Sequence, residues 1–209
     1  MGKIDINKQR KRDALYDSAF GLFTSRGIHN TSISDIVENA GVAKGTFYLY
    51  FKDKYDIRNK LIIHKAAEVF RRADEELQKQ DFSRFEGYEI YEERVIFLAD
   101  NIISQFAQDT TLLKFISKKL GWGMIRNFLA EPEEESEGGY DIYKSVFGGC
   151  DCPYEDKEIM VYMIIELVSS TCYGAILFGE PVGIDGLKPY LFRTLRRIMQ
   201  EHQRPLATP

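Results

Sequence analysis

At 209 residues, of which 44% are hydrophobic and 29% charged, the chain is long enough to bury a core in one or two domains. Polar residues interrupt every long apolar run, and the amino terminus MGKIDINKQRKR has no apolar stretch, so we expect neither a membrane span nor a signal peptide. The formal charge of −4 is uneven, because residues 1–55 hold nine Lys and Arg against six Asp and Glu, a net +3 that leaves −7 for the remainder.

The basic charge gathers near the amino terminus, as expected for a region that approaches nucleic acid. Four basic residues lie ahead of the first expected helix: Lys8, Arg10, Lys11 and Arg12. A flexible basic arm there would add contacts to phosphates. A solubilising tail explains the same residues equally well, so both interpretations stay open.

Residues 31–61 are the most informative stretch, and they begin with a helix whose ends can be predicted. Ser32 and Asp35 fit the capping box that opens a helix. The apolar stripe that follows at helical spacing consists of Ile33, Ile36, Val37 and Ala40. Gly41 comes directly after the stripe, where a left-handed C-cap is expected. A tight turn therefore follows this helix.

A short second helix comes after the turn. Phe47 and Phe51 are four residues apart and should face the core. The residues that flank this apolar side form two four-apart pairs: Lys44 with Tyr48, and Thr46 with Tyr50. Gly45 lies roughly opposite, where a missing side chain lets the backbone approach a phosphate closely.

Asp53, between Lys52 and Lys54, is well placed to cap a third helix. Helix, tight turn and short helix in this order are the format of a helix-turn-helix, which places its second helix in the major groove of DNA. Any amphipathic helical hairpin could supply the same caps and stripe. The pattern therefore favours DNA binding over a purely structural hairpin without requiring it.

Residues 9–63 resemble the N-terminal domain of the TetR (tetracycline-repressor) family of bacterial transcription regulators. The matching pieces are a first helix reading RDALYDSAFGLFTSRG, the run TSISDIVENAGVAKGTFYLYF, and KDK at the start of the fourth helix. The sequence departs from the family pattern at Leu49, where an aromatic residue is frequent, and at Tyr50, where histidine is common. Leu49 leaves open what that face of the helix contacts.

The resemblance implies a set of DNA-contacting residues. Three of them would bond phosphates: Thr31, Tyr50 and Lys54. Three at the start of the recognition helix would reach base edges or nearby phosphates: Lys44, Gly45 and Thr46. Tyr48 would pack on the sugar-phosphate backbone or on a thymine methyl. Phosphate contacts would set the position of the helix, and base contacts would set the sequence that it reads.

The rest of the chain predicts helices and no strand, so the expected fold class is all-α. Helices are expected at residues 53–80, 91–108, 111–129 (interrupted near Gly121 and Gly123), 141–147, 157–178 and 187–203. Loops are expected at residues 81–88, 131–139 and 148–156. We divide the chain into a three-helix helix-turn-helix DNA-binding domain, residues 1–55, and a helical-bundle ligand-binding and dimerisation domain, residues 56–209.

The helix at 157–178 is apolar on most of its surface, so it must be buried on more than one side. In proteins similar to this one, the last two helices pair with their symmetry mates in a homodimer. The predicted interface residues are Ile165, Val168, Ser169, Cys172, Ile176, Leu191, Leu195 and Ile198. There is also an independent physical reason to expect a dimer, because one recognition helix reads few bases and a two-fold pair reads a palindrome.

The resemblance further implies a small-molecule site in the C-terminal domain. Its candidates are polar or aromatic side chains within helical patterns: Phe97, Asn101, Phe115, Trp122, Phe128 and Tyr173. Phe106, Met124 and Tyr143 belong to the same wider set. Plain core packing explains any one of them at least as well. Trp122, between two glycines, is the strongest candidate, and the pocket should be mainly apolar.

No catalytic pattern is evident, so we do not expect an enzyme. His29, His64 and His202 lie in separate regions, and no metal or nucleophile motif includes them. Cys150 and Cys152 form C-x-C without a second pair or a histidine cluster, so we expect no metal and no cofactor. Few cysteines and no signal peptide predict a reducing, cytoplasmic location.

These features together predict a homodimeric regulator that binds double-stranded DNA at a palindromic operator and responds to an unidentified small-molecule effector. A repressor released by its ligand is the favoured form. The alternative is a helical DNA-binding regulator controlled by a protein partner, without a small-molecule inducer. A filled C-terminal core would favour that alternative.

Overall fold

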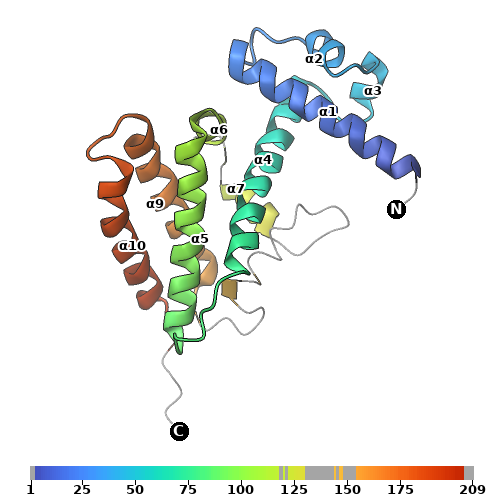
Figure 1. The fold of residues 1–209 in the computed structure, drawn as a ribbon. Helices are drawn as coiled ribbons and strands as arrows, with labels where there is room; N and C mark the ends of the chain where they lie inside the picture. Colours follow the sequence, from blue (N-terminus) through green and yellow to red (C-terminus); the bar gives the residue numbers. More distant parts are fainter. Residues whose placement is uncertain are drawn as a thin grey trace. The chain divides into compact units, whose positions relative to one another are not determined.

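The computed structural model describes residues 3–117, 120, 122–129, 144, 146–147 and 154–204. In this part of the chain the regular elements are helices, apart from an isolated bridge between Tyr154 and Gln203, and the predicted all-α class is confirmed. The chain divides into two compact units, Met1–His64 and Lys65–Pro209, called here the N-terminal and C-terminal units. Figure 1 follows the helices along the sequence.

The N-terminal unit contains α1 (Lys3–Arg26), α2 (Ile33–Asn39), α3 (Lys44–Tyr48) and the beginning of α4 (Lys54–Leu77). The predicted domain division after residue 55 falls inside α4, which is continuous. The earlier start of α1 differs from the expected arm, since the basic residues at 8–12 are helical. After Gly2 this segment has neither Gly nor Pro and is rich in Lys, Arg and Gln, which favour helix.

The local signals around α2 are confirmed. The Ser32 hydroxyl accepts a bond from the Asp35 N–H (3.1 Å), and the Asp35 carboxylate accepts one from the Ser32 N–H (2.8 Å). The backbone bond from Ser32 also lowers the pKa of the Asp35 carboxyl. Gly41 has a φ of +66°, the left-handed conformation expected after the helix. The Val42 N–H reaches back to the Val37 carbonyl (3.0 Å), which closes the turn.

Long-range contacts join α1 to α2 and α3. The buried Ser18 hydroxyl of α1 donates to the Ile36 carbonyl of α2 (2.7 Å). Tyr16 packs its ring 5.4 Å from that of Phe51, which in turn lies 5.5 Å from Phe47. Because Phe47 is fully buried, the inward side of α3 is fixed by this aromatic core.

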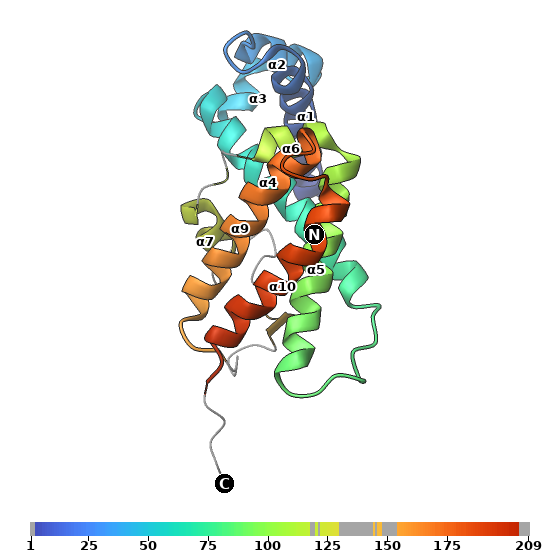
Figure 2. The same cartoon turned by 90° about the vertical axis from the view of Figure 1, so that its left-hand side faces the viewer.

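The C-terminal unit contains the end of α4, then α5 (Tyr88–Gln108), α6 (Thr110–Ile116), α7 (Trp122–Leu129), α9 (Lys157–Leu177) and α10 (Ile184–Glu201). In Figure 2, α5, α9 and α10 lie side by side, and their apolar faces form its core. The predicted interruption near Gly121 is confirmed, since α6 ends at Ile116 and α7 begins at Trp122, but Gly123 lies inside α7 and does not interrupt it. The expected loop at 131–139 lies outside the described residues, as do Cys150 and Cys152.

The most apolar helix of the described residues is α9. By length and composition alone it could cross a membrane, although the core helix of a soluble protein passes the same test. Only 22% of its most apolar stretch is buried within the chain. Met160, Ile164, Cys172 and Ala175 form the buried side. Among the described residues, most of the apolar stretch of α9 is therefore only partly buried or exposed.

Candidate nucleic-acid interface and apolar cavity

The outward side of α3 is an exposed surface that combines a cation, a glycine and two large side chains. Lys44 and Gly45 are exposed at its start, and nothing lies within 4 Å of where a Cβ on Gly45 would be. Tyr48 and Leu49 follow one turn later, with exposed fractions of 54% and 78%. The backbone of this turn can therefore approach another molecule closely, with Lys44 and Tyr48 beside it.

The position of α3 is fixed from both ends. The first turn of α3 is closed by the Thr46 N–H, which donates to the carbonyl of the N-cap Ala43 (2.8 Å). The Lys60 ammonium of α4 donates to the Tyr50 carbonyl (3.0 Å) just after it. Thr46, one of the predicted contact residues, is half-buried beside this turn. The exposed residues Lys44, Gly45, Tyr48 and Leu49 are called here the reading surface. A surface that recognises DNA bases needs such rigidity, because recognition depends on atoms held at defined positions.

Thr31 and Lys54 both serve the turn between α1 and α2. Thr31 is 1% exposed, and its hydroxyl donates to the Gly27 carbonyl (2.9 Å). The Lys54 ammonium donates to the carbonyls of Ile28 (2.9 Å), Thr31 (3.1 Å) and His29 (3.3 Å). Sequence reasoning assigned both residues to phosphates and missed these internal bonds. Their phosphate contacts stay a prediction, and the buried Thr31 hydroxyl is already engaged in this conformation.

Tyr50 contacts the beginning of α1. Its hydroxyl donates to the Lys8 carbonyl (3.2 Å), forty-two residues away in sequence. Lys8 and Lys11 are exposed on that part of α1. The Tyr50 side chain thus helps to fix a basic helical segment near the reading surface, and its contact with phosphate stays a prediction.

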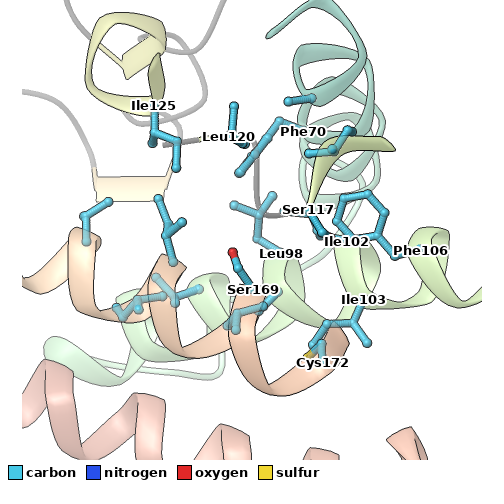
Figure 3. Close-up of a pocket in the computed structure, with 18 of the residues that line it drawn as sticks. Phe70, Leu98, Ile102, Ile103, Phe106, Ser117, Leu120, Ile125, Ser169 and Cys172 are labelled. Carbon is cyan, nitrogen blue, oxygen red and sulfur yellow. The ribbon is translucent and has the colours of Figure 1, made fainter. Parts of the chain in front are cut away.

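The C-terminal unit contains an apolar cavity of about 180 Å³. Its walls come from α4, α5, α6, α7 and α9, and its lining includes Phe70, Leu98, Ile102, Ile103, Phe106, Leu120, Ile125 and Phe147 (Figure 3). The polar lining side chains are Ser117, Ser169 and Cys172, and in Figure 3 the Ser169 hydroxyl is directed toward the cavity. Burial raises the pKa of the Cys172 thiol to about 11, so it is neutral there. No charged side chain of the described residues lines this cavity.

The five predicted ligand-binding residues whose side chains are described, Phe97, Asn101, Phe115, Trp122 and Tyr173, are not among those that line the cavity, although Phe106 of the wider set is. Trp122 packs against Tyr162 (ring centroids 5.0 Å apart), Phe97 against Phe82 (6.3 Å), and Tyr173 against Phe178 (6.2 Å). Asn101 accepts a bond from Gln105 (2.9 Å), and Phe115 is buried. The side chains of Phe128, Met124 and Tyr143 lie outside the described residues. The ligand-binding role of these residues stays a prediction.

Of the predicted interface residues, Ser169 is exposed and the others are partly or fully buried. Ile165, Val168, Ser169 and Cys172 line the cavity. Leu191 and Leu195 are 3% and 0% exposed, so their own chain already covers them. Ile176 and Ile198 are partly buried against the same core. The exposed large hydrophobic residues of α9, α10 and their connection are instead Ile159, Tyr162, Phe178, Val182 and Tyr190.

Comparison with known proteins agrees with this architecture. Residues 15–61 match the family model described as bacterial regulatory proteins, tetR family. The chain is 36% identical over 73 residues to the fatty acid metabolism regulator protein of Bacillus subtilis, a stretch that covers 35% of this chain and 38% of that relative.

Solved structures extend the likeness in fold over nearly the whole chain. A tetR family transcription regulator from Shewanella sp. PV-4 superposes with a TM-score of 0.60 at 17% identity, covering 93% of this chain and 99% of that one. The regulator FadR from Bacillus subtilis, solved with stearoyl-CoA, gives 0.52 at 20% identity, covering 87% and 96%. The N-terminal match and the shared all-helical fold together lead to one conclusion: residues 15–61 form an N-terminal domain of the tetR family of bacterial regulatory proteins, and the chain as a whole shares the fold of these solved structures.

Proposed function

We propose that this protein is a cytoplasmic, homodimeric transcription regulator, a repressor that leaves a palindromic operator when a small molecule fills its cavity. The exposed face of α3, with Lys44, Gly45 and Tyr48 above a buried Phe47, is the observation that carries the proposal. A rigid short helix with a close-approach glycine and a flanking cation suits the major groove. The net +3 charge of residues 1–55 favours approach to phosphates.

The effector that we propose has an uncharged aliphatic portion. The cavity walls are aliphatic and aromatic, with two hydroxyls and one neutral thiol to orient a ligand. Bacillus subtilis FadR, a structural neighbour, is solved with stearoyl-CoA, which makes a long acyl chain the first ligand to try. An open cavity also supports small-molecule control over the protein-partner alternative, which a filled core would favour.

The dimer that we propose forms through α9 and α10. The exposed Ile159 and Tyr162 of α9, Phe178 and Tyr190 are apolar, and a second copy would remove them from water. Two recognition helices would then meet successive major grooves roughly 34–36 Å apart. A ligand acts as an inducer only if it binds a state that mismatches this spacing more tightly than the DNA-bound state.

The test is fluorescence anisotropy with the DNA upstream of the protein's own gene, over a salt series. The variant Lys44→Ala/Tyr48→Ala should lose at least roughly tenfold in affinity, since each good base contact contributes about 1–3 kcal/mol. Lys79→Ala, an exposed change at the end of α4, is the control and should bind like wild type. Stearoyl-CoA should release wild-type protein from the DNA.

Equal, weak binding by wild type and the double variant would contradict DNA reading by α3 on that DNA, and a genomic selection would then supply other sites. Tight binding that stearoyl-CoA and free fatty acids leave unchanged would contradict acyl control while leaving the DNA function intact.

A further inference from the structure

The reading surface of α3 contains one large apolar side chain, Leu49, to which the proposed function assigns no role. We propose that Leu49 is a specificity-determining residue that packs on the C5-methyl group of a thymine in the major groove. This inference rests on the proposed function, and it adds the base that one position of each half-site must present.

Leu49 is uncovered to an unusual degree. It is 78% exposed, the largest fraction among the large hydrophobic side chains of the described residues. Single exposed leucines are common on protein surfaces, so exposure alone decides nothing. The location of Leu49 is more informative, because it lies within the surface that also presents Lys44, Gly45 and Tyr48.

The helical geometry of α3 places Leu49 on the outward side. Leu49 is the C-cap of α3 with φ −73° and ψ −24°, so the helical spacing from Gly45 to Leu49 is preserved. Four residues are about one turn, which aligns Leu49 with Gly45, where the backbone is bare. Phe47, two residues earlier and so on the opposite side, is fully buried.

The chemistry of leucine restricts its partner on DNA. It has no donor or acceptor, so it cannot bond a phosphate or the polar edge of guanine, adenine or cytosine. In the major groove only thymine offers a methyl group. Lys44 on the same face and the positive charge of residues 1–55 draw this surface to DNA rather than to an apolar protein partner.

The experiment begins with in vitro selection of double-stranded DNA by the wild-type protein. In the selected palindrome each thymine is replaced in turn by deoxyuracil, which removes only the methyl group. When the thymine that Leu49 contacts in a half-site is replaced, wild type should lose roughly three- to tenfold in affinity. A loss of this size is expected when one methyl group is no longer buried. Leu49→Ala should bind the thymine and deoxyuracil forms equally, and Leu49→Met should keep the sensitivity.

Leu49→Ala should also relax the thymine preference at that position when the selection is repeated, and its Tm should match wild type because the side chain is exposed. If wild type selects a tight site but every deoxyuracil substitution affects wild type and Leu49→Ala alike, the thymine contact is refuted and DNA reading stands. If wild type selects no DNA at all, the proposed function fails and this inference fails with it.

Discussion

At the scale of single residues, Lys54 shows how a cation can stabilise a turn. Its ammonium donates to three carbonyls, those of Ile28, His29 and Thr31, in the connection that leads into α2. These carbonyls follow the end of α1 and have no helical partner of their own. Bonds from a charged group are stronger than neutral ones, so the side chain links the start of α4 to the turn before α2.

Lys54→Met should therefore destabilise the N-terminal unit by about 1–3 kcal/mol, because three carbonyls lose a charged donor. Hydrogen exchange in residues 26–34 should become faster, and Tm should fall. Lys52→Met, two positions earlier and exposed, is the matched control and should change neither. Unchanged exchange in Lys54→Met would show that water replaces the ammonium without cost.

Glu92 is a second residue whose surroundings set its chemistry. It is 7% exposed at the beginning of α5 and accepts bonds from Gln203 (3.2 Å) and Gln200 (3.4 Å). Burial raises the pKa of its carboxyl, an effect that Gln200 and Arg196 oppose and that Glu93 and Glu89 reinforce. The folded protein therefore binds this proton more tightly than the unfolded chain does.

Because its pKa is raised in the folded protein, Glu92 makes its full contribution to stability at pH values below the unfolded pKa. That contribution is lost progressively as the pH rises through the folded pKa. Thermal unfolding between pH 4 and pH 7.5 should show Glu92→Gln gaining stability relative to wild type as pH rises, since the amide stays neutral and can still accept both bonds. Glu86→Gln, exposed just before the same helix, controls for loss of a negative charge. A pH-independent difference between wild type and Glu92→Gln would contradict this assignment.

At the scale of elements, the beginning of α1 depends on a contact far away in sequence. The Tyr50 hydroxyl donates a hydrogen bond to the Lys8 carbonyl (3.2 Å), while terminal helical turns otherwise fray readily. The exposed Lys8 and Lys11 lie on these turns. The bond should therefore keep basic side chains in a fixed place for phosphates.

Tyr50→Phe removes only this hydroxyl, which is worth about 1 kcal/mol. Hydrogen exchange in residues 3–11 should speed up, and operator affinity should fall roughly fivefold with a shallower salt dependence. Tyr55→Phe, a half-exposed tyrosine on α4, is the control. If affinity falls while exchange is unchanged, Tyr50 touches the phosphate directly, as the family resemblance implied, and does not act through α1.

At the scale of the whole molecule, the dimer that we propose depends on the surface of α9 and α10. Phe178, directly after α9, is 66% exposed. Tyr190, within α10, is 62% exposed. A charge at either position would be costly to bury between two copies.

Tyr190→Glu with Phe178→Glu should shift wild-type dimers to monomers in sedimentation velocity and should weaken operator binding, because one recognition helix alone holds too few bases. Tyr55→Glu places the same charge on another exposed aromatic residue and should stay dimeric. A wild-type protein that sediments as a monomer at micromolar concentration would refute the dimer itself.

The sequence by itself determined the parts of this protein that depend on local bonds. The capping box of Ser32 and Asp35, the left-handed Gly41 and the Asp53 cap, whose carboxylate accepts from the N–H groups of Tyr55 and Asp56, involve residues at most four positions apart. Their geometry follows from residue type and spacing, and it was predicted correctly. The order of helices and the break before α7 follow in the same way from periodicity and glycine.

The tertiary structure alone decided which sides of these helices meet. A helix as apolar as α9 gives no preferred side, so its sequence does not distinguish Cys172, which lines the cavity, from Tyr162, which is exposed. Likewise, Thr31 and Lys54 have partners that depend on how α1 and α4 approach the turn before α2. These contacts join residues distant in sequence, and only the packing of the whole unit sets their distances.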